Sequence, residues 1–287
     1  MAVFENAALD DHERVLFCRD ASGGLSAIIA IHSTALGPAA GGCLLWSYAT
    51  DDAALTDVLR LSQGMSYKNA MAGLRLGGGK AVIIRHDSFS GSAELYERYG
   101  EFVDTLRGDY ITAEDVGMTV DIMQMISRRT KYVTGLPRAD GQAGGDPSPK
   151  TSWGIFKGIE AAVQHKLDRE SVEGLTVAVQ GVGNVGYHLC RYLHDAGASL
   201  LVADIDGGRT GRVREEFGAR VVGLDDILSQ EADVLAPCAL GAVLNEASIP
   251  QLRASIVAGG ANNQLETDED GRRLQSRGIL YAPDYVI

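Results

Sequence analysis

Two lysines are the strongest candidates for chemistry in this sequence. Lys68 and Lys80 lie twelve residues apart in the glycine-rich stretch Met65-Ser66-Tyr67-Lys68-Asn69-Ala70-Met71-Ala72-Gly73-Leu74-Arg75-Leu76-Gly77-Gly78-Gly79-Lys80. The chain has only six lysines against twenty arginines, so lysine is not its default surface cation. Burial can lower the pKa of a lysine toward neutrality, which suits it to proton transfer. The glycines before Lys80 would let a ligand approach the backbone, although a flexible turn with solvated lysines is an alternative.

A second motif has the pattern of a dinucleotide-binding loop. Residues 175–180 form an apolar run typical of a strand. The pattern G-x-G-x-x-G follows in Gly181-Val182-Gly183-Asn184-Val185-Gly186, and residues 187–193 then show the apolar stripe of a helix. A second predicted strand, residues 199–203, ends in Asp204. The glycines would permit a tight turn, admit the pyrophosphate and let helix and strand pack, while the acid would bind the ribose hydroxyls. The acid favours NAD over NADP, although Arg209 and Arg212 follow it closely.

Composition narrows the class of protein. A length of 287 residues is enough for two domains, and a net charge of −12 argues against nucleic acid or an anionic membrane as a partner. No signal peptide or long apolar run is present. The cysteines have no metal-binding spacing, so we expect free thiols in a reducing cytoplasm and no metal site: Cys18, Cys43, Cys190 and Cys238.

The predicted elements divide the chain into domains 1–138 and 139–287, around a segment rich in glycine and proline at 135–149. In the first domain, the patterns predict a hairpin of strands over 13–19 and 25–33, further strands over 81–84 and 110–113, and helices over 51–65, 92–106 and 119–128. Residues 37–42 break the strand pattern. In the second domain, a helix over 151–166 precedes alternating strands and helices, with later strands over 220–222, 233–236, 255–258 and 279–282. This alternation predicts a parallel sheet with helices on both faces.

Several long motifs carry a family resemblance over nearly the whole chain. In the first half they are Leu36-Gly37-Pro38-Ala39, Gly64-Met65-Ser66-Tyr67-Lys68-Asn69, Leu76-Gly77-Gly78-Gly79-Lys80-Ala81, Glu114-Asp115-Val116-Gly117 and Asp146-Pro147-Ser148-Pro149. In the second half they are residues 180–186, Ala236-Pro237-Cys238-Ala239-Leu240-Gly241, Ala261-Asn262-Asn263-Gln264 and Tyr281-Ala282-Pro283-Asp284-Tyr285-Val286-Ile287. The chain resembles the Glu/Leu/Phe/Val dehydrogenase family, in particular its leucine (branched-chain amino acid) dehydrogenases.

The resemblance implies an α/β fold: an N-terminal α/β substrate domain, a C-terminal Rossmann doubly wound parallel sheet, and an active-site cleft between them that closes on the substrate. It also implies a homo-oligomer assembled through the first domain. The implied reaction is the reversible, NAD-dependent oxidative deamination of an L-amino acid to the 2-oxo acid and ammonia. Family members usually continue after Ile287 with further helices, which help to form the side-chain pocket and are absent from this sequence.

Site residues are carried over motif by motif. Lys80 resembles the general base that acts through a water, and Asp115 the acid that exchanges protons with the amino group; Asp115 could instead cap the next helix. Lys68 resembles the lysine that binds the substrate carboxylate. Further substrate contacts are expected from Gly41, Gly42, Met65, Ala113 and Asn262. Cofactor contacts are expected from Gly181, Gly183, Asn184, Val185, Gly186, Asp204, Thr151, Cys238, Ala239 and Asn262.

Some alternatives remain open. Asn262 could be a turn residue, and Cys238 is expected only to line the site. Ala40, Met65 and Ala113 would form an apolar pocket, which disfavours glutamate and favours leucine or valine, with phenylalanine or tryptophan as the alternative. A non-catalytic relative that binds NAD or an amino acid is the alternative of another class. It would have no need for Lys68, Lys80 and Asp115, so these residues favour the enzyme.

Overall fold

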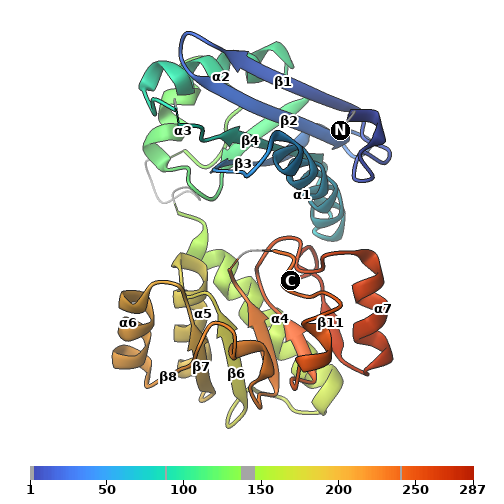
Figure 1. Ribbon diagram of the computed structural model, residues 1–287, viewed down its shortest axis with the longest axis vertical. Helices are drawn as coiled ribbons and strands as arrows, with labels where there is room; N and C mark the ends of the chain where they lie inside the picture. Colours follow the sequence, from blue (N-terminus) through green and yellow to red (C-terminus); the bar gives the residue numbers. More distant parts are fainter. Residues whose placement is uncertain (1–2, 88, 137–145, 240) are drawn as a thin grey trace. The chain divides into compact units, whose positions relative to one another are not determined.

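The computed structural model describes residues 3–87, 89–136, 146–239 and 241–287. They form two compact units, Met1–Asp146 and Pro147–Ile287, each with its own sheet (Figure 1). The predicted boundary between residues 138 and 139 lies outside the described residues and stays a prediction. Among the described helices, none is both long enough and apolar enough to cross a membrane.

A mixed sheet in the order β1-β2-β4-β3-β5 organises the first unit. Its strands are β1 (Arg14–Asp20), β2 (Leu25–Ser33), β3 (Ala39–Trp46), β4 (Gly77–Ile84) and β5 (Tyr110–Glu114). Strands β1 and β2 form the predicted antiparallel hairpin, and β2 is also antiparallel to β4. Strand β3 lies parallel to both β4 and β5, so the carboxyl ends of these three strands share one edge of the sheet.

Helices cover both faces of this sheet. After the short 3-10 helix η1 (Val3–Glu5), they are α1 (Asp51–Met71), α2 (Ala93–Thr105) and α3 (Val120–Ser127). Each of the three α-helices begins after a hydroxyl side chain that accepts a backbone N–H, a cap that stabilises a helix by about 1 kcal/mol: Thr50, Ser92 and Thr119. Side chains alternate along β4, so Val82 and Ile84 pack against α1, while Ala81 and Ile83 pack against α2 and α3.

The second unit contains the predicted parallel sheet. Its strands are β6 (Thr176–Gln180), β7 (Ser199–Ala203), β8 (Arg220–Val221), β9 (Val234–Pro237), β10 (Ile256–Ala258) and β11 (Leu280–Ala282), in the order β11-β10-β9-β6-β7-β8. All the pairings are parallel, and this is the strand order of a doubly wound dinucleotide-binding fold. One face is covered by α4 (Ser148–Leu167), α5 (Asn184–Asp195) and α6 (Gly207–Phe217), and the other by α7 (Asp268–Ser276) and the 3-10 helices η2 (Ile227–Ser229) and η3 (Ile249–Gln251).

Three predictions for the first unit were wrong. Helix α1 continues six residues beyond the predicted end and ends at Met71, because nothing in residues 66–71 breaks a helix. Residues 37–42 break the strand pattern only at Gly37 and Pro38, which form a bend, whereas residues 39–42 belong to β3 and contradict the prediction. Strand β4 begins at Gly77 rather than after Lys80, so the glycines are neither a turn nor an opening for a ligand.

Close packing explains the glycines of β4. A Cβ atom at Gly78 would lie 2.0 Å from the Ser66 hydroxyl oxygen, and one at Gly79 would lie 2.7 Å from the Tyr110 ring. At Gly77, a Cβ atom would meet the Ser33 carbonyl oxygen at 2.0 Å. The absent side chains therefore let α1 and the neighbouring strands approach the backbone of β4 directly.

His12 and His32 form a pair that contacts helix α1. His12 Nε2 is 2.8 Å from the Ser62 hydroxyl, and His32 Nδ1 is 2.8 Å from the Ser66 hydroxyl. The two rings meet edge to face with their centroids 4.8 Å apart. Burial, followed by the charge of His12, lowers the pKa of His32, although Asp10, Asp11 and Glu13 act in the opposite direction.

This lowered pKa predicts a pH-dependent stability. The unfolded chain binds a proton at residue 32 more readily than the folded protein, so the free energy of unfolding should fall as the pH drops below about 6.5. His32→Asn should make that fall shallower between pH 7 and 5, measured by denaturant unfolding at each pH. His86→Asn, at an exposed position, is the matched control. Parallel pH profiles for the wild type and His32→Asn would contradict this expectation.

Candidate active site

In the first unit, Lys80 and Asp115 form a buried ion pair. Lys80 lies on β4 two residues before Val82, so its side chain projects from the same face of the sheet, the one that α1 covers. The residue is only 3% exposed. Its Nζ donates to Asp115 Oδ2, and Asp115 Oδ1 accepts the Val116 N–H at 2.8 Å. Thr119, not Asp115, caps α3, so the alternative of Asp115 as a helix cap is wrong. An amine that is buried away from solvent next to a carboxylate is suited to proton transfer.

Several of the predicted substrate-binding residues of this unit lie near that pair. A Cβ atom at Gly42 would lie 2.5 Å from Asp115 Oδ2, and Gly42 is opposite Ala113 in the register of β3 and β5. A Cβ atom at Gly41 would lie 3.1 Å from Met65 Cγ on α1. Lys68 is partly buried, three residues after Met65 and so on the same side of α1. The strand register therefore places Lys80, Gly42 and Ala113 side by side across β4, β3 and β5, with Asp115 directly after β5.

Sequence reasoning missed Glu114, the last residue of β5. Its Oε2 atom is buried and has no hydrogen-bond partner among the described residues. Burial raises the pKa of this carboxyl, and the charges of Asp146 and Asp115 raise it further. The quoted motif Glu114-Asp115-Val116-Gly117 contained the residue, but two adjacent acids at a strand end do not reveal which one is deprived of solvent. The end of β5 thus carries a second carboxyl, directly before Asp115 in the sequence.

In the second unit, the glycines of the G-x-G-x-x-G loop have separate roles. Gly181 has a φ angle of +91° and packs against Ala239, and a Cβ atom at Gly186 would lie 2.0 Å from the Gly181 carbonyl oxygen. At Gly183, the nearest neighbour of a Cβ atom would be the side-chain end of Arg209 at 3.5 Å. Helix α5 begins at Asn184 with no side chain capping its N–H groups. These N–H groups and the space at Gly183 suit a phosphate group.

Asp204 follows β7 and is fixed by backbone N–H groups. Its Oδ2 accepts the Val182 N–H at 2.7 Å and its Oδ1 accepts the Asp206 N–H at 2.9 Å. Each carboxylate oxygen has a further lone pair, so the group can still accept a ribose hydroxyl. The acid is thus tied directly to the glycine-rich loop.

The remaining predicted cofactor residues lie near the same edge of the parallel sheet. Cys238 and Ala239 follow β9, and the Cys238 N–H donates to the Gln180 carbonyl at 2.7 Å. Burial raises the pKa of the Cys238 thiol to about 11, which agrees with a lining role. Asn262 lies in a turn after β10, as the alternative interpretation expected, and its contact with a ligand stays a prediction. Strands β7 and β9 flank β6 on opposite sides, so this edge is the switch point where doubly wound sheets bind ligands.

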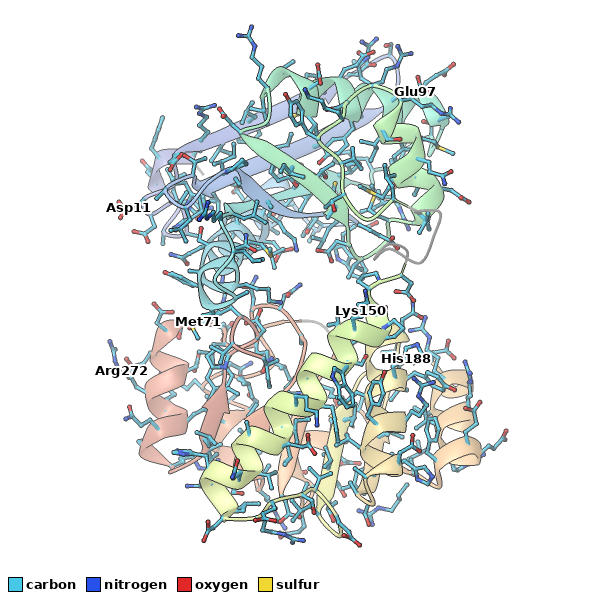
Figure 2. All side chains as sticks on the ribbon, turned by 180° about the vertical axis from the view of Figure 1, so that it is seen from behind. Asp11, Met71, Glu97, Lys150, His188 and Arg272 are labelled. Atoms are coloured by element: carbon cyan, nitrogen blue, oxygen red, sulfur yellow. The ribbon has the colours of Figure 1, made fainter. Side chains whose placement is uncertain are left out.

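Thr151 lies in the first turn of α4, next to the start of α5. The neighbouring Ser152 hydroxyl donates to the Val185 carbonyl at 2.7 Å, which joins the two helices. Figure 2 labels Lys150 and His188 on these helices. Thr151 is thus one residue from this link to α5, and its contact with the cofactor stays a prediction.

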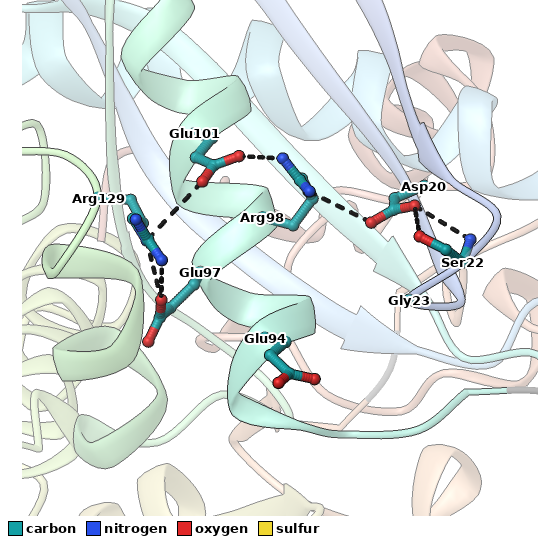
Figure 3. Close-up of a pocket in the computed structure, with 8 residues that line it drawn as sticks. All are labelled: Asp20, Ser22, Gly23, Glu94, Glu97, Arg98, Glu101 and Arg129. Atoms are coloured by element: carbon teal, nitrogen blue, oxygen red, sulfur yellow. Dashed lines mark hydrogen bonds and ion pairs between the residues drawn. The ribbon is translucent and has the colours of Figure 1, made fainter.

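A separate surface depression of about 280 Å³ lies on the first unit (Figure 3). It is lined by a chain of ion pairs in which Arg98 contacts Asp20 and Glu101, and Arg129 contacts Glu97. The arginine side chains are about half exposed, so solvent screens these pairs and each contributes little to stability. None of the predicted site residues lines this depression.

Comparison with known proteins gives matches over both units. The family model described as Glu/Leu/Phe/Val dehydrogenase, dimerisation domain, matches residues 12–132, and that of glutamate/leucine/phenylalanine/valine dehydrogenase matches residues 146–210 and 208–287. Leucine dehydrogenase of Bacillus subtilis (strain 168) is 50% identical over 287 residues, which are 100% of this chain and 79% of that protein. Phenylalanine dehydrogenase of Bacillus thermotolerans is 44% identical over 284 residues, 97% of this chain and 74% of that protein.

A solved structure agrees with these matches. The crystal structure of L-tryptophan dehydrogenase from Nostoc punctiforme is 47% identical, with a TM-score of 0.74 over 96% of this chain and 78% of that one. A doubly wound sheet with a glycine-rich loop, and a buried lysine–carboxylate pair on a second sheet, are the features of an amino-acid dehydrogenase. The chain belongs to the glutamate/leucine/phenylalanine/valine dehydrogenase family.

Proposed function

We propose that this protein catalyses the reversible, NAD-dependent oxidative deamination of an apolar L-amino acid, leucine or valine by preference, to its 2-oxo acid and ammonia. The observation that carries the proposal is the ion pair of Lys80 and Asp115 beside Gly42 in the first sheet. The identity of 50% to a leucine dehydrogenase supports the substrate class. A homo-oligomer assembled through the first unit, working in the cytoplasm, completes the proposal.

Substrate binding is assigned to residues of known position. Lys68 binds the substrate carboxylate, beside Gly41 and Gly42, because a fixed cation favours an anion and glycines leave room for it. Met65 and Ala113, with Ala40, face the apolar side chain of the substrate. None of these three carries a charge, so the side-chain carboxylate of glutamate would have no partner among them. Asn262 of the second unit is proposed to hold the substrate as well.

Proton transfer is assigned to Lys80 and Asp115. Hydride leaves the α-carbon only when the amine is neutral, so a group must first take the ammonium proton, and Asp115 is that group. The iminium that forms carries positive charge, and the carbonyl oxygen of the now protonated Asp115 carboxyl can accept one of its N–H groups. Lys80 in its neutral form then removes a proton from the water that adds to the imine carbon. Asp115 returns its proton to the carbinolamine nitrogen, and ammonia leaves as the Asp115 carboxylate takes the hydroxyl proton, which leaves the carbonyl of the 2-oxo acid.

The second unit fits a dinucleotide. The uncapped start of α5, the space at Gly183 and the Asp204 carboxylate match a phosphate, a close backbone approach and a ribose, respectively. Gly181, Asn184, Val185 and Gly186 complete the loop, and Thr151, Cys238 and Ala239 are proposed to lie beside the nicotinamide. When bound, NAD supplies the hydride acceptor for the reaction.

Gly183→Ala should separate cofactor binding from folding. Among the described residues outside its chain neighbours, only the mobile end of Arg209 lies within 4 Å of the added methyl group, so the midpoint of thermal unfolding should change by no more than about 2 °C. The methyl group would occupy the space expected for the pyrophosphate, and the Kd for NADH should rise about tenfold or more. NADH fluorescence titration measures the Kd. Unchanged NADH affinity would contradict the assignment of this loop.

The function itself is tested by NADH absorbance at alkaline pH with a panel of L-amino acids. NADH formation with leucine or valine supports the proposal, and preferential formation with phenylalanine or tryptophan supports the alternative substrate class. A protein that binds NADH in fluorescence titration but forms none with any amino acid would be the non-catalytic relative. The panel should include glutamate, for which we expect no turnover.

A further inference from the structure

We propose that Arg209 binds a phosphate group of the dinucleotide, an inference that rests on the proposed cofactor site. Arg209 is the third residue of α6, which follows Asp204 in sequence. Its Nη1 atom is 3.5 Å from where a Cβ atom of Gly183 would be, and it is the nearest atom to that position. The guanidinium group is therefore next to the glycine that would admit the pyrophosphate.

The local contacts orient Arg209 without neutralising it. Its Nε atom is 3.4 Å from Asp206 Oδ2, and Asp206 is itself fixed as the cap of α6 through the Gly208 N–H at 2.8 Å. In the part of the chain that the structure describes, Asp206 is the acid within ion-pair distance of Arg209. Both side chains are more than half exposed, so this pair is weak. The outer N–H groups of Arg209 can therefore donate to an anion that binds at Gly183.

A second arginine on the same helix has a different environment. Arg212 lies 4.0 Å from the centroid of the Tyr187 ring, and its Nε donates to Glu216 at 2.8 Å. Its Nη2 donates to the Tyr187 hydroxyl at 2.7 Å. The side chain of Arg212 thus links α6 to α5. Its substitution removes one arginine from the same helix and so provides a matched control.

Two phosphate groups could be the partner, and position favours one of them. The bridging pyrophosphate occurs in NAD and NADP, whereas the 2′-phosphate occurs only in NADP. Arg209 contacts the position of Gly183 at the start of α5, while the ribose site is marked by Asp204, whose charge repels a 2′-phosphate. We therefore expect Arg209 to act on the pyrophosphate and to affect both cofactors equally.

The test compares Arg209→Gln with Arg212→Gln by isothermal titration calorimetry of NADH, NADPH, ADP-ribose and adenosine. Arg209→Gln should weaken NADH and ADP-ribose about tenfold, the loss of one charge-assisted hydrogen bond, and leave the affinity for adenosine unchanged. It should also lower the salt dependence of NADH binding, because one phosphate contact is removed. Arg212→Gln should leave all these affinities near those of the wild type.

Each outcome decides a separate point. A loss confined to NADPH would assign Arg209 to the 2′-phosphate instead of the pyrophosphate. Equal affinities for the wild type and Arg209→Gln, or equal losses in both variants, would overturn the inference while leaving the proposed function intact. A wild-type protein that binds no dinucleotide would overturn the proposed function, and the role of Arg209 with it.

Discussion

Lys80→Ala is expected to lower kcat/KM for the amino-acid substrate by about 10²–10⁴-fold, the usual contribution of a positioned acid–base group. Lys80 is 3% exposed, so bulk water cannot easily reach its position and act as the base in its place. The fall should appear in kcat, because Lys68 and the apolar pocket still bind the substrate. Steady-state NADH formation at several amino-acid concentrations separates the two constants.

The control must separate chemistry from folding. Lys80→Ala leaves the Asp115 carboxylate without its cation, and breaking a buried pair from one side typically costs about 3–5 kcal/mol, less here because Asp115 is 19% exposed. Lys80→Ala combined with Asp115→Asn removes both charges and should recover part of that stability without recovering activity. NADH binding should stay at the wild-type level in both variants. Loss of NADH binding would instead mean that Lys80 has a structural role.

Gly78→Ala is expected to destabilise the protein by about 3 kcal/mol or more, at the upper end for an added methyl group in a packed core. The new Cβ would lie 2.0 Å from the Ser66 hydroxyl oxygen, 2.3 Å from the Ser66 backbone nitrogen and 2.5 Å from the Ser62 carbonyl oxygen. Two of these three atoms belong to the backbone of α1, so rotation of a side chain cannot relieve the contact. The helix must move away from β4, and the KM for the amino acid should rise because Met65 and Lys68 move with it.

Gly64→Ala is the matched control, in α1 between Ser62 and Ser66. Among the described residues, and apart from its chain neighbours and the backbone of its own helix, no atom lies within 4 Å of the added methyl group. Alanine is the better helix former by about 0.5–1 kcal/mol, so this variant should be slightly more stable than the wild type. Urea unfolding of the three proteins measures both effects. Similar stability for Gly78→Ala and the wild type would show that the packing of α1 does not require glycine at this position of β4.

The second unit could be predicted from sequence because its signals are local. The strand, the glycine-rich loop, the helix and Asp204 follow one another within thirty residues, and the parallel sheet follows from their alternation. The first unit was harder, because β3 pairs with strands that come much later in the chain. Its glycines suggested a break, whereas burial between two parallel neighbours makes Gly41 and Gly42 part of a strand.

The same limit applies to the site. The unusual use of lysine marked Lys80, but its partner Asp115 was found only through a family motif, because pairing across thirty-five residues leaves no periodic trace. The unpartnered oxygen of Glu114 depends on how the chain folds around it and has no sequence signal. Arg209 was noted only as a charge near the acid, and its position beside Gly183 required coordinates.

The contact of Met65 with Gly41 suggests how substrate preference can be redesigned. Helix α1 is held on β4 by backbone packing and by the Asn69 amide, which donates to the Gly77 carbonyl at 2.6 Å. The contacts that attach it come from Ser62, Ser66 and Asn69 rather than from Met65. Shorter or longer side chains at residue 65 should therefore resize the proposed pocket while Lys68, the proposed carboxylate anchor, keeps its place. Libraries built at residue 65 would explore new amino acids without giving up the framework that orients them.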